Sequence, residues 1–376
     1  MIRIISITAL VFAGLRLLVA LVNYLFRPGK KPGVDVEELP VSVLIPARNE
    51  ENNIGKLLDQ LGSQDYHNLE IIVLDDSSDD NTAAVVREKM AADSRIKLIE
   101  NDHVPGGWSG KNHACHLLSR EAGGKYFLFL DADISIRGNI IPAMLHYLER
   151  HGLVLLSIFP KQIMRSFGER ITVPNMNWIL LSLLPLLMVR LSKRPSLSAA
   201  NGQFMLFDAA AYRSLRPHEM VRSSLVEDIE MMRKLKKMRP DSGRRRSLRN
   251  RYKTAVLTGD DRISCRMYAD FDQAVHGFSK NVLHFFGNSL LWTFIFLFLT
   301  GPVIFIIPFY SLPFALIYLL AGILTRVLIS LTSRQNIVHN TVLAPLQQLS
   351  LWFIVYKAVK IKFAGSYTWK GRQVKT

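Results

Sequence analysis

Short apolar runs alternate with amphipathic stretches through the middle of this chain. The apolar runs have the length of buried strands, and the stretches between them are typical of helices. The predicted strands are residues 41–45, 70–74, 96–99 and 126–130. The predicted helices are residues 50–61, capped by Asn49, then 81–90 and 111–122. Strands and helices that alternate over short connections predict an α/β fold, with an open, mostly parallel sheet and helices on both faces.

Polar segments follow three of these predicted strands. They are PARNE at 46–50, DDSSDD at 75–80 and DAD at 131–133. In open parallel sheets, ligands bind beyond the carboxyl ends of the strands. We therefore expect the three segments to meet at one edge of the sheet and to form a binding site.

The DAD segment offers two carboxylates directly after a buried strand. If the segment stays extended, Asp131 and Asp133 point to the same side and face one ion. Carboxylates without a nearby His or Cys cluster suit Mg²⁺ or Mn²⁺ holding a diphosphate better than zinc. Taken alone, the D-x-D pattern also fits a solvated loop.

Long apolar stretches lie at both ends of the chain, and the mean hydropathy is +0.16. Residues 4–26, 290–309 and 312–331 are long enough to cross a bilayer, and 342–359 is a weaker candidate. The first stretch is too long for a cleavable signal peptide, and no small-x-small site follows it. We expect a transmembrane helix in 1–30, a cytosolic domain in 40–285 and a membrane region with a basic tail in 286–376.

Basic residues set the expected topology. Arg27, Lys30 and Lys31 follow the first stretch, which places the middle of the chain in the cytoplasm. A basic tail on the same side requires 342–359 to be a re-entrant or surface helix. The expected location is the inner (cytoplasmic) membrane, with several passes. Residues 175–191 are apolar but short, which predicts a helix at the membrane interface or an ordinary core helix.

The net charge of +16 requires a partner or a surface. Residues 233–253 hold eleven Lys or Arg and one acid, Asp241. Anionic lipid headgroups suit this run better than nucleic acid, because Tyr252 is its one aromatic residue. A solvated loop without a partner fits equally well. Cys115 and Cys265 are far apart in sequence, so we expect reduced thiols rather than a disulfide framework.

The ordered motifs PARNEEN, LDDSSDD, LDAD and VEDIEMMRKL resemble the family-two glycosyltransferases, inverting enzymes of GT-A fold, over residues 41–281. Three further segments are GWSGKNHAC at 107–115, RMYADFDQAVHGFSKN at 266–281 and WKGRQ at 369–373. They resemble the membrane-bound carotenoid-acid glycosyltransferases of the staphyloxanthin pathway and their hopanoid-associated relatives.

This resemblance implies roles for residues of the three polar segments. Asp131 and Asp133 would bind a divalent cation, Mg²⁺ or Mn²⁺, which neutralises the departing diphosphate. For Asp76 the alternative is a helix cap. The implied nucleoside-binding residues are Pro46, Ala47, Arg48, Glu50, Asp75 and Asp76.

The resemblance also implies the groups that act on the sugar and the acceptor. Asp228 would take the acceptor's proton with Glu227 in support, although acids also favour a helix amino end. Lys111 would oppose the charge of the donor, unless it is an ordinary first-turn lysine. Gly202 and Gln203 would touch the sugar, or belong to a buried strand with a tight turn. Lys280 would hold the diphosphate, or anchor the chain at the membrane interface.

The predicted function is transfer of one sugar from a nucleotide-sugar, a UDP-hexose, to a lipid such as a carotenoid or another isoprenoid. Processive synthases of the family carry Gln-x-x-Arg-Trp where this chain has QAVHG, so chain extension is not expected. A lipid hydroxyl needs a base such as Asp228, whereas an acid acceptor does not. Alternatives are a polyprenyl-phosphate or glycolipid sugar transferase, a sugar nucleotidyltransferase, a non-catalytic nucleotide-binding scaffold and a nucleic-acid-binding membrane protein.

Overall fold

The computed structural model describes residues 1–27, 38–224, 226–238, 252–364, 366–369 and 372–375. The chain folds into two compact units. One unit comprises 28–161 and 186–265, and the other comprises 1–27, 162–185 and 266–376. Most of the predicted basic run, 239–251, lies outside the described residues.

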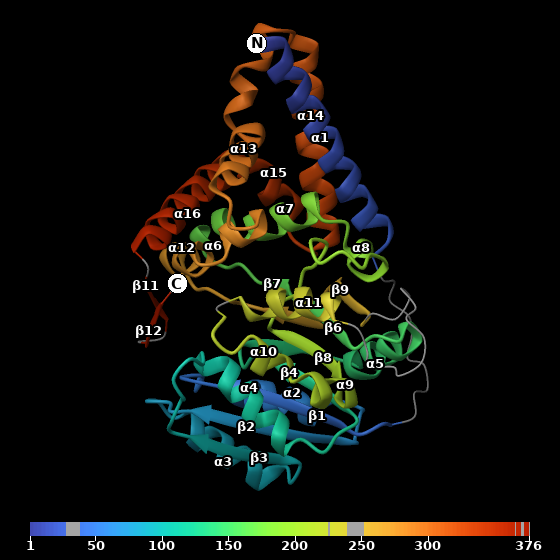
Figure 1. Ribbon diagram of the computed structural model, residues 1–376, viewed down its shortest axis with the longest axis vertical. Coiled ribbons are helices and arrows are strands. Elements are labelled where there is room, and N and C mark those ends of the chain that lie inside the picture. Colours follow the sequence, from blue (N-terminus) through green and yellow to red (C-terminus); the bar gives the residue numbers. More distant parts are fainter. Residues whose placement is uncertain (28–37, 225, 239–251, 365, 370–371, 376) are drawn as a thin grey trace. The chain divides into compact units, whose positions relative to one another are not determined.

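The unit of 28–161 and 186–265 is built on a seven-stranded sheet of order β3-β2-β1-β4-β8-β6-β9 (Figure 1). The strands are β1 Val41–Ala47, β2 Leu69–Asp76, β3 Ile96–Asn101, β4 Tyr126–Leu130, β6 Leu155–Phe159, β8 Phe204–Asp208 and β9 Thr254–Thr258. Neighbours from β3 to β4 are parallel, β8 is antiparallel to β4 and β6, and β9 is parallel to β6. A second sheet has the order β5-β10-β7, from Ile134–Ile136, Ile263–Cys265 and Lys161–Gln162.

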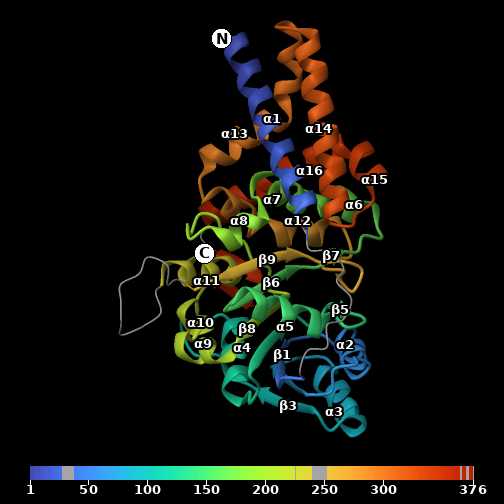
Figure 2. The ribbon, with the colours of Figure 1, turned by 90° about the vertical axis from the view of Figure 1, so that its right-hand side faces the viewer.

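Helices cover both faces of the main sheet, which explains why strands β1, β2 and β4 are buried along almost their whole length. On one face, Val43, Ile45 and Ile71 pack in a core with α2, α3 and α5. On the other face, rings of Phe129 and Phe207 contact helices α9 and α10. Figures 1 and 2 show these layers. The helices of this unit are α2 Ile54–Gly62, α3 Thr82–Ala92, α4 Gly110–Glu121, α5 Ile140–His151, α8 Leu186–Leu191, α9 Ala209–Leu215, α10 Pro217–Met220 and α11 Glu227–Lys237.

The predicted α/β sheet is confirmed, with two local corrections. Asn49 does not cap the first helix: its φ is 54°, and α2 begins after Asn53. The helix predicted over 175–191 is broken, because α7 ends at Leu183 and α8 begins at Leu186. Pro185 lies in the break, where it lacks the backbone N–H that a continuous helix needs.

The other unit is helical and contains two helices long and apolar enough to cross a membrane, α1 Ile2–Leu25 and α14 Leu312–Thr332. The span predicted over 290–309 is not one straight helix: α13 Leu290–Thr300 is followed, after a bend of 43°, by η2 Pro302–Phe305 and η3 Ile307–Phe309. Gly301 and Pro302 at the break explain the bend. Helix α16, Ala344–Ala364, is not among the candidate spans of the described residues.

The remaining elements of this unit are short. They are α6 Phe167–Thr172, α7 Pro174–Leu183, α12 Phe271–Ser279, η1 Val282–Phe286, α15 Ile337–Val342, β11 Ser366–Trp369 and β12 Arg372–Lys375. Glu169 lies buried in α6, where it accepts hydrogen bonds from the Ser166 backbone and the Arg266 guanidinium. These bonds hold the pKa of Glu169 at about 2, against the effect of its burial.

Candidate active site

The polar segments after β1, β2 and β4 lie at one edge of the sheet, as predicted. Strand β1 pairs in parallel with both β2 and β4, and Ala47 at its end lies opposite Asp75. The carboxyl ends of the three strands therefore point the same way. This register, rather than any local motif, brings together residues that are far apart in sequence.

Hydrogen bonds join the turn after β1 to the turn after β2. Arg48 donates to the main-chain oxygen of Asp76 at 2.8 Å, and the backbone N–H of Glu50 donates to Thr82 Oγ1 at 2.8 Å. The side-chain oxygen of Asn49 accepts from the backbone of Asp79 at 2.9 Å. Asn49 thus links two turns in the left-handed conformation that Asn tolerates well.

Asp75 and Asp76 end β2 and are buried. The Asp75 carboxylate accepts from the Ser78 hydroxyl, and Asp76 Oδ1 accepts from Asn101 Nδ2 at 3.2 Å. The alternative reading of Asp76 as a helix cap is wrong, because the N-cap residue of α3 is Asn81.

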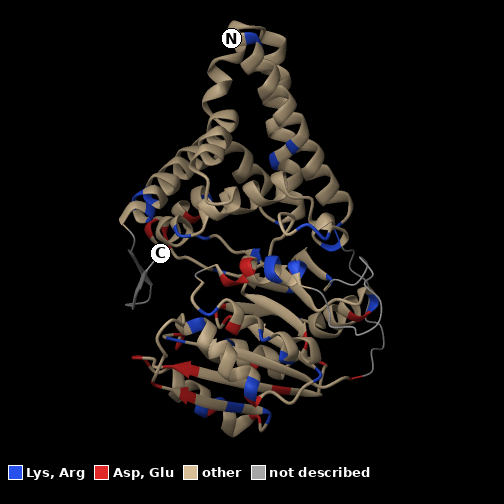
Figure 3. Cartoon of the chain, viewed as in Figure 1, with Lys and Arg blue, Asp and Glu red and all other residues tan. Residues whose placement is uncertain are grey.

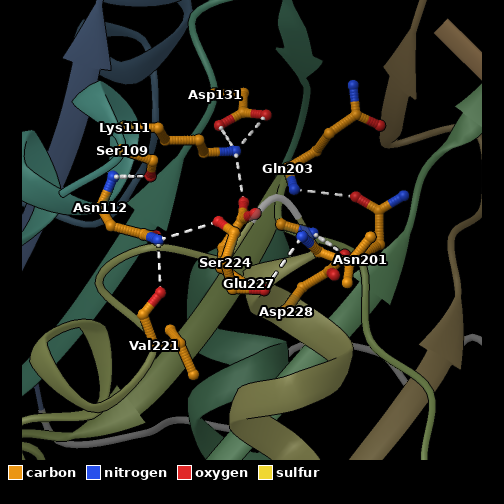
Figure 4. Close-up of polar contacts among 12 residues, drawn as sticks. Ser109, Lys111, Asn112, Asp131, Asn201, Gln203, Val221, Ser224, Glu227 and Asp228 are labelled. Carbon is orange, nitrogen blue, oxygen red and sulfur yellow. Dashed lines mark hydrogen bonds and ion pairs between the residues drawn. The ribbon is translucent and has the colours of Figure 1, made fainter. Parts of the chain in front are cut away.

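Lys111 joins the end of β4 to the start of α11 (Figure 4). It lies in the first turn of α4, and its Nζ is 2.7 Å from Asp131 Oδ1 and 3.5 Å from Glu227 Oε1. Burial alone would lower the pKa of Lys111, but the two carboxylates outweigh burial and raise it. The alternative of an ordinary first-turn lysine therefore does not hold, because this cation lies between two acids.

Asp228 is held by two backbone donors. Its Oδ2 accepts from the Gly202 N–H at 3.1 Å and its Oδ1 from the Ile229 N–H at 2.7 Å. Burial, followed by the charge of Glu227, raises the pKa of Asp228 to about 7. A carboxylate with such a pKa is matched to proton transfer near neutral pH.

Gly202 has no room for a side chain without moving these groups. A Cβ there would lie 3.1 Å from Lys111 Nζ and 3.2 Å from Glu227 Oε1. The glycine thus allows the backbone between Asn201 and Gln203 to approach the charged groups closely.

The segment 131–133 is a turn, so the expectation of an extended DAD is wrong. The backbone N–H of Ile134 donates to the main-chain oxygen of Asp131 at 3.3 Å. Asp131 contacts Lys111, whereas Asp133 accepts from Gln203 Nε2 at 3.3 Å. The two carboxylates still influence one another, because burial and then the Asp131 charge raise the pKa of Asp133 to about 6.

The donor set fits a divalent cation that arrives with a diphosphate. The described residues contain no group of three or more His, Cys, Asp or Glu side chains able to hold a metal ion. Two carboxylates completed by phosphate and water oxygens are, however, a common Mg²⁺ arrangement. Asp131 and Asp133 would hold such a cation, whose charge would offset both the burial and the Asp131 charge that raise the pKa of Asp133.

One predicted site residue lies in the other unit. Lys280 is the C-cap residue of α12, and its part in the site stays a prediction. Pro46 and Ala47 are the last residues of β1, at the edge described above.

Two asparagines of the site were missed from the sequence. Asn112 is fully buried and donates to the main-chain oxygens of Val221 at 2.8 Å and Ser224 at 3.2 Å, which fixes the segment leading to Glu227. Asn201 Oδ1 accepts from the Gln203 N–H at 2.8 Å. Asn112 follows Lys111 within GWSGKNHAC, but its partners lie too far along the chain for a local motif to reveal them.

Known proteins resemble the chain in sequence and in fold. The model of glycosyl transferase family 2 matches residues 42–216, which include every candidate site residue except Glu227, Asp228 and Lys280. A 4,4'-diaponeurosporenoate glycosyltransferase from Staphylococcus haemolyticus is 26% identical over 64% of this chain. One from Staphylococcus aureus is 34% identical over 34% of this chain. The matches span 60% and 34% of the lengths of those relatives.

A solved structure shares the fold. A mannosyltransferase from Pyrobaculum calidifontis, in complex with GDP-mannose and Mn²⁺, aligns with 96% of this chain and 99% of its own, with a TM-score of 0.53 and 16% identity. The two cysteines form no disulfide, and both are buried. The sheet and its carboxylate edge thus have a GT-A-like fold, and residues 42–216 of the chain match the model of glycosyl transferase family 2.

Proposed function

We propose that the protein is a membrane-associated, inverting glycosyltransferase that moves one sugar from a UDP-hexose to a lipid acceptor. The observation that carries this proposal is a network of charged groups. In it, Lys111 forms ion pairs with Asp131 and Glu227, and Asp228 accepts a hydrogen bond from the Gly202 N–H. The names of the staphylococcal relatives support a carotenoid or other isoprenoid as the acceptor. In this proposal, residues 1–30 form a transmembrane helix, 40–285 the cytosolic catalytic domain and 286–376 a membrane region with a basic tail.

The donor's nucleoside would lie at the ends of β1 and β2. Arg48, Glu50, Asp75 and Asp76 offer donors and carboxylate acceptors there, and a carboxylate suits the ring N–H of uracil. Beside them, Asp131 and Asp133 would hold Mg²⁺ or Mn²⁺, which when bound neutralises charge on the diphosphate. Gln203, Gly202 and Lys280 are the proposed contacts of the sugar and the diphosphate.

The proposed reaction is a single displacement at the anomeric carbon. Asp228 accepts the proton of the acceptor hydroxyl, and the acceptor oxygen forms a bond to the anomeric carbon from the face opposite the diphosphate. The bond from that carbon to the diphosphate oxygen breaks, and its electron pair leaves with the nucleoside diphosphate. Burial and then the charge of Glu227 raise the pKa of Asp228 and thereby make it a stronger base.

Two observations favour different acceptors. The raised pKa of Asp228 favours a lipid hydroxyl, because a base is needed only for an acceptor that is not yet ionised. The name of the staphylococcal relatives, diaponeurosporenoate glycosyltransferase, favours a carotenoid acid, whose carboxylate is ionised at neutral pH. A polyprenyl phosphate, the other alternative, would also arrive ionised.

Asp228→Asn separates these acceptors. Full-length protein in detergent is given UDP-glucose, Mn²⁺ and either a lipid alcohol or a carotenoid acid, and the product is measured by mass. With the alcohol, Asp228→Asn should lose about 10²- to 10⁴-fold in turnover. With the acid, it should keep most of its turnover.

Asp59→Asn is the matched control. Asp59 forms an exposed ion pair with Lys89 between α2 and α3, so this variant should behave as wild type with both acceptors. If wild-type protein glycosylates neither lipid with any of several nucleotide-sugars, GDP-mannose included, the transferase proposal fails.

We also propose that the protein resides in the inner (cytoplasmic) membrane, with several passes and its catalytic domain facing the cytoplasm. The two candidate spans and the basic residues after the first of them support this arrangement. A tag placed after Thr376 should be protected in intact cells. Detection of the tag from outside would contradict the topology.

A further inference from the structure

Two arginines are buried inside the helical unit. Arg16 lies past the middle of α1 and Arg326 in the last third of α14, with exposed fractions of 7% and 9%. Both helices are candidate membrane spans and contain no Asp or Glu, and Figure 3 shows them largely without charge. Long basic side chains in a membrane usually extend to its surface, but these two do not reach solvent.

The two guanidinium groups contact one tryptophan of α7. The Cζ atoms of Arg16 and Arg326 lie 4.2 Å and 4.7 Å from the centre of the Trp178 ring. They are therefore within about 9 Å of each other, where like charges repel strongly in an apolar region.

The polar partners of both groups are neutral. Arg16 Nε donates to Ser182 Oγ at 3.0 Å, and Arg326 donates to Gln347 Oε1 at 2.5 Å and to the main-chain oxygen of Asn340 at 3.3 Å. One terminal nitrogen of Arg16, NH2, is buried without a hydrogen-bond partner. Among the described residues, neither arginine forms an ion pair with a carboxylate.

Two buried positive charges without a negative partner are costly in a protein interior and more so at membrane depth. Contact with the indole face compensates each charge in part. The unsatisfied NH2 group of Arg16 shows that the compensation is incomplete. An oxyanion would satisfy this donor and offset both charges, because guanidinium groups match phosphate and carboxylate geometry.

We propose that Arg16 and Arg326 bind the anionic head of a lipid, a phosphate or a carboxylate, beside Trp178. The rings of Phe12 and Phe296 lie 5.7 Å and 5.3 Å from the Arg16 guanidinium, so the surroundings of this group are otherwise apolar. This site goes beyond the proposed sugar transfer and does not depend on it, because every residue that forms it belongs to the helical unit.

The competing explanation is that the arginines only tie helices together through Trp178. The two explanations predict different changes in stability when an arginine is replaced by the neutral glutamine. If the arginines only tie helices, Arg16→Gln lowers stability in every lipid. If they bind an anionic lipid, Arg16→Gln removes the stabilising effect of that lipid and costs little without it, since it also removes an uncompensated charge.

The test measures thermal unfolding of the full-length protein in nanodiscs of phosphatidylcholine, with and without phosphatidylglycerol. Phosphatidylglycerol should raise the melting temperature of wild type by several degrees. Arg16→Gln and Arg326→Gln should lose this shift. The control is Arg27→Gln. Arg27 follows the end of α1, is partly exposed and donates to the main-chain oxygen of Leu331 in α14, so this variant should keep the shift.

Two further measurements identify the ligand, and they test the proposal even if a variant does not fold. Inorganic phosphate added to phosphatidylcholine nanodiscs should have no effect, and an equal effect of phosphate would refute a lipid ligand. Native mass spectrometry of the wild type should show retained phosphatidylglycerol in preference to phosphatidylcholine. A wild type that retains both lipids equally, or glutamine variants that keep the melting shift, would overturn the proposal.

Discussion

Lys111 is the residue on which the charged network depends. Lys111→Met is therefore the most informative substitution in the unit of residues 28–161 and 186–265. The lysine lies 2.7 Å from Asp131 and 3.5 Å from Glu227. Methionine keeps the length of the side chain and removes its charge. Two carboxylates then face each other without a cation.

The expected loss of stability follows from these distances. With an effective dielectric constant of about 20, unit charges at 2.7 Å and 3.5 Å attract by about 6 and about 5 kcal/mol. Desolvation offsets most of this attraction, and the side chains of Lys111 and Asp131 are 37% and 26% exposed, so water screens the pair. The expected loss in the free energy of unfolding lies between the loss for a surface ion pair and the loss for a broken buried pair, which gives about 2 kcal/mol.

The assay is thermal unfolding without donor or metal, where about 2 kcal/mol corresponds to a melting shift of roughly 4–8 °C. Because the pKa of Lys111 is raised in the folded state, its contribution is complete below the unfolded pKa of about 10.4 and is lost only as the pH rises through the folded value. The loss in Lys111→Met should therefore be the same at pH 7 and pH 9.

Lys125→Met is the control, because Lys125 lies 3.9 Å from Glu149 and both side chains are well exposed. It should shift the melting temperature by less than about 2 °C. The account of the network is refuted if Lys111→Met melts like wild type, if its loss disappears by pH 9, or if Lys125→Met loses as much.

Three further predictions concern turnover, metal binding and pH dependence. Gly202→Ala should fold but lose roughly 10- to 100-fold in turnover, because its Cβ displaces the ends of Lys111 and Glu227. The control is Gly62→Ala, whose Cβ would make only ordinary contacts and which should match wild type. Equal turnover in the two variants would contradict the close approach at Gly202. Asp133→Asn should weaken Mn²⁺ binding at least about tenfold in the presence of UDP, as followed by electron paramagnetic resonance, and unchanged binding would place the metal elsewhere. With a lipid alcohol, kcat/KM should fall as the pH drops through the raised pKa of Asp228, to about a tenth at pH 6 of its value at pH 8; a flat profile would exclude Asp228 as the base.

The four parallel strands β1 to β4 of the seven-stranded sheet were predictable because their signals are local. Buried parallel strands appear as short apolar runs, and each of the four predicted runs became a strand of the sheet. The position of PARNE, DDSSDD and DAD at one edge of the sheet follows from the parallel arrangement of the strands alone, without knowledge of any side-chain contact. The end of α7 could also have been placed, because Pro185 interrupts the apolar run of 175–191.

The contacts within the site were not predictable, because they depend on register between distant segments. Lys111 and Glu227 belong to different helices, and neither sequence motif indicates that the two side chains lie 3.5 Å apart. Asp131 and Asp133 were assigned to one side on the assumption of an extended chain, and the turn at 131–133 gives them different partners. A local pattern selects the residue types, whereas the tertiary fold decides which atoms meet.

The most direct test of the central claim is a comparison of lipid extracts by mass from three kinds of cell: cells with the wild-type gene, without the gene, and with the Asp133→Asn variant. If the carboxylates at the sheet edge transfer one sugar to a lipid, a lipid heavier by one hexose is present only with the wild-type gene. The same lipids in all three extracts would contradict that claim.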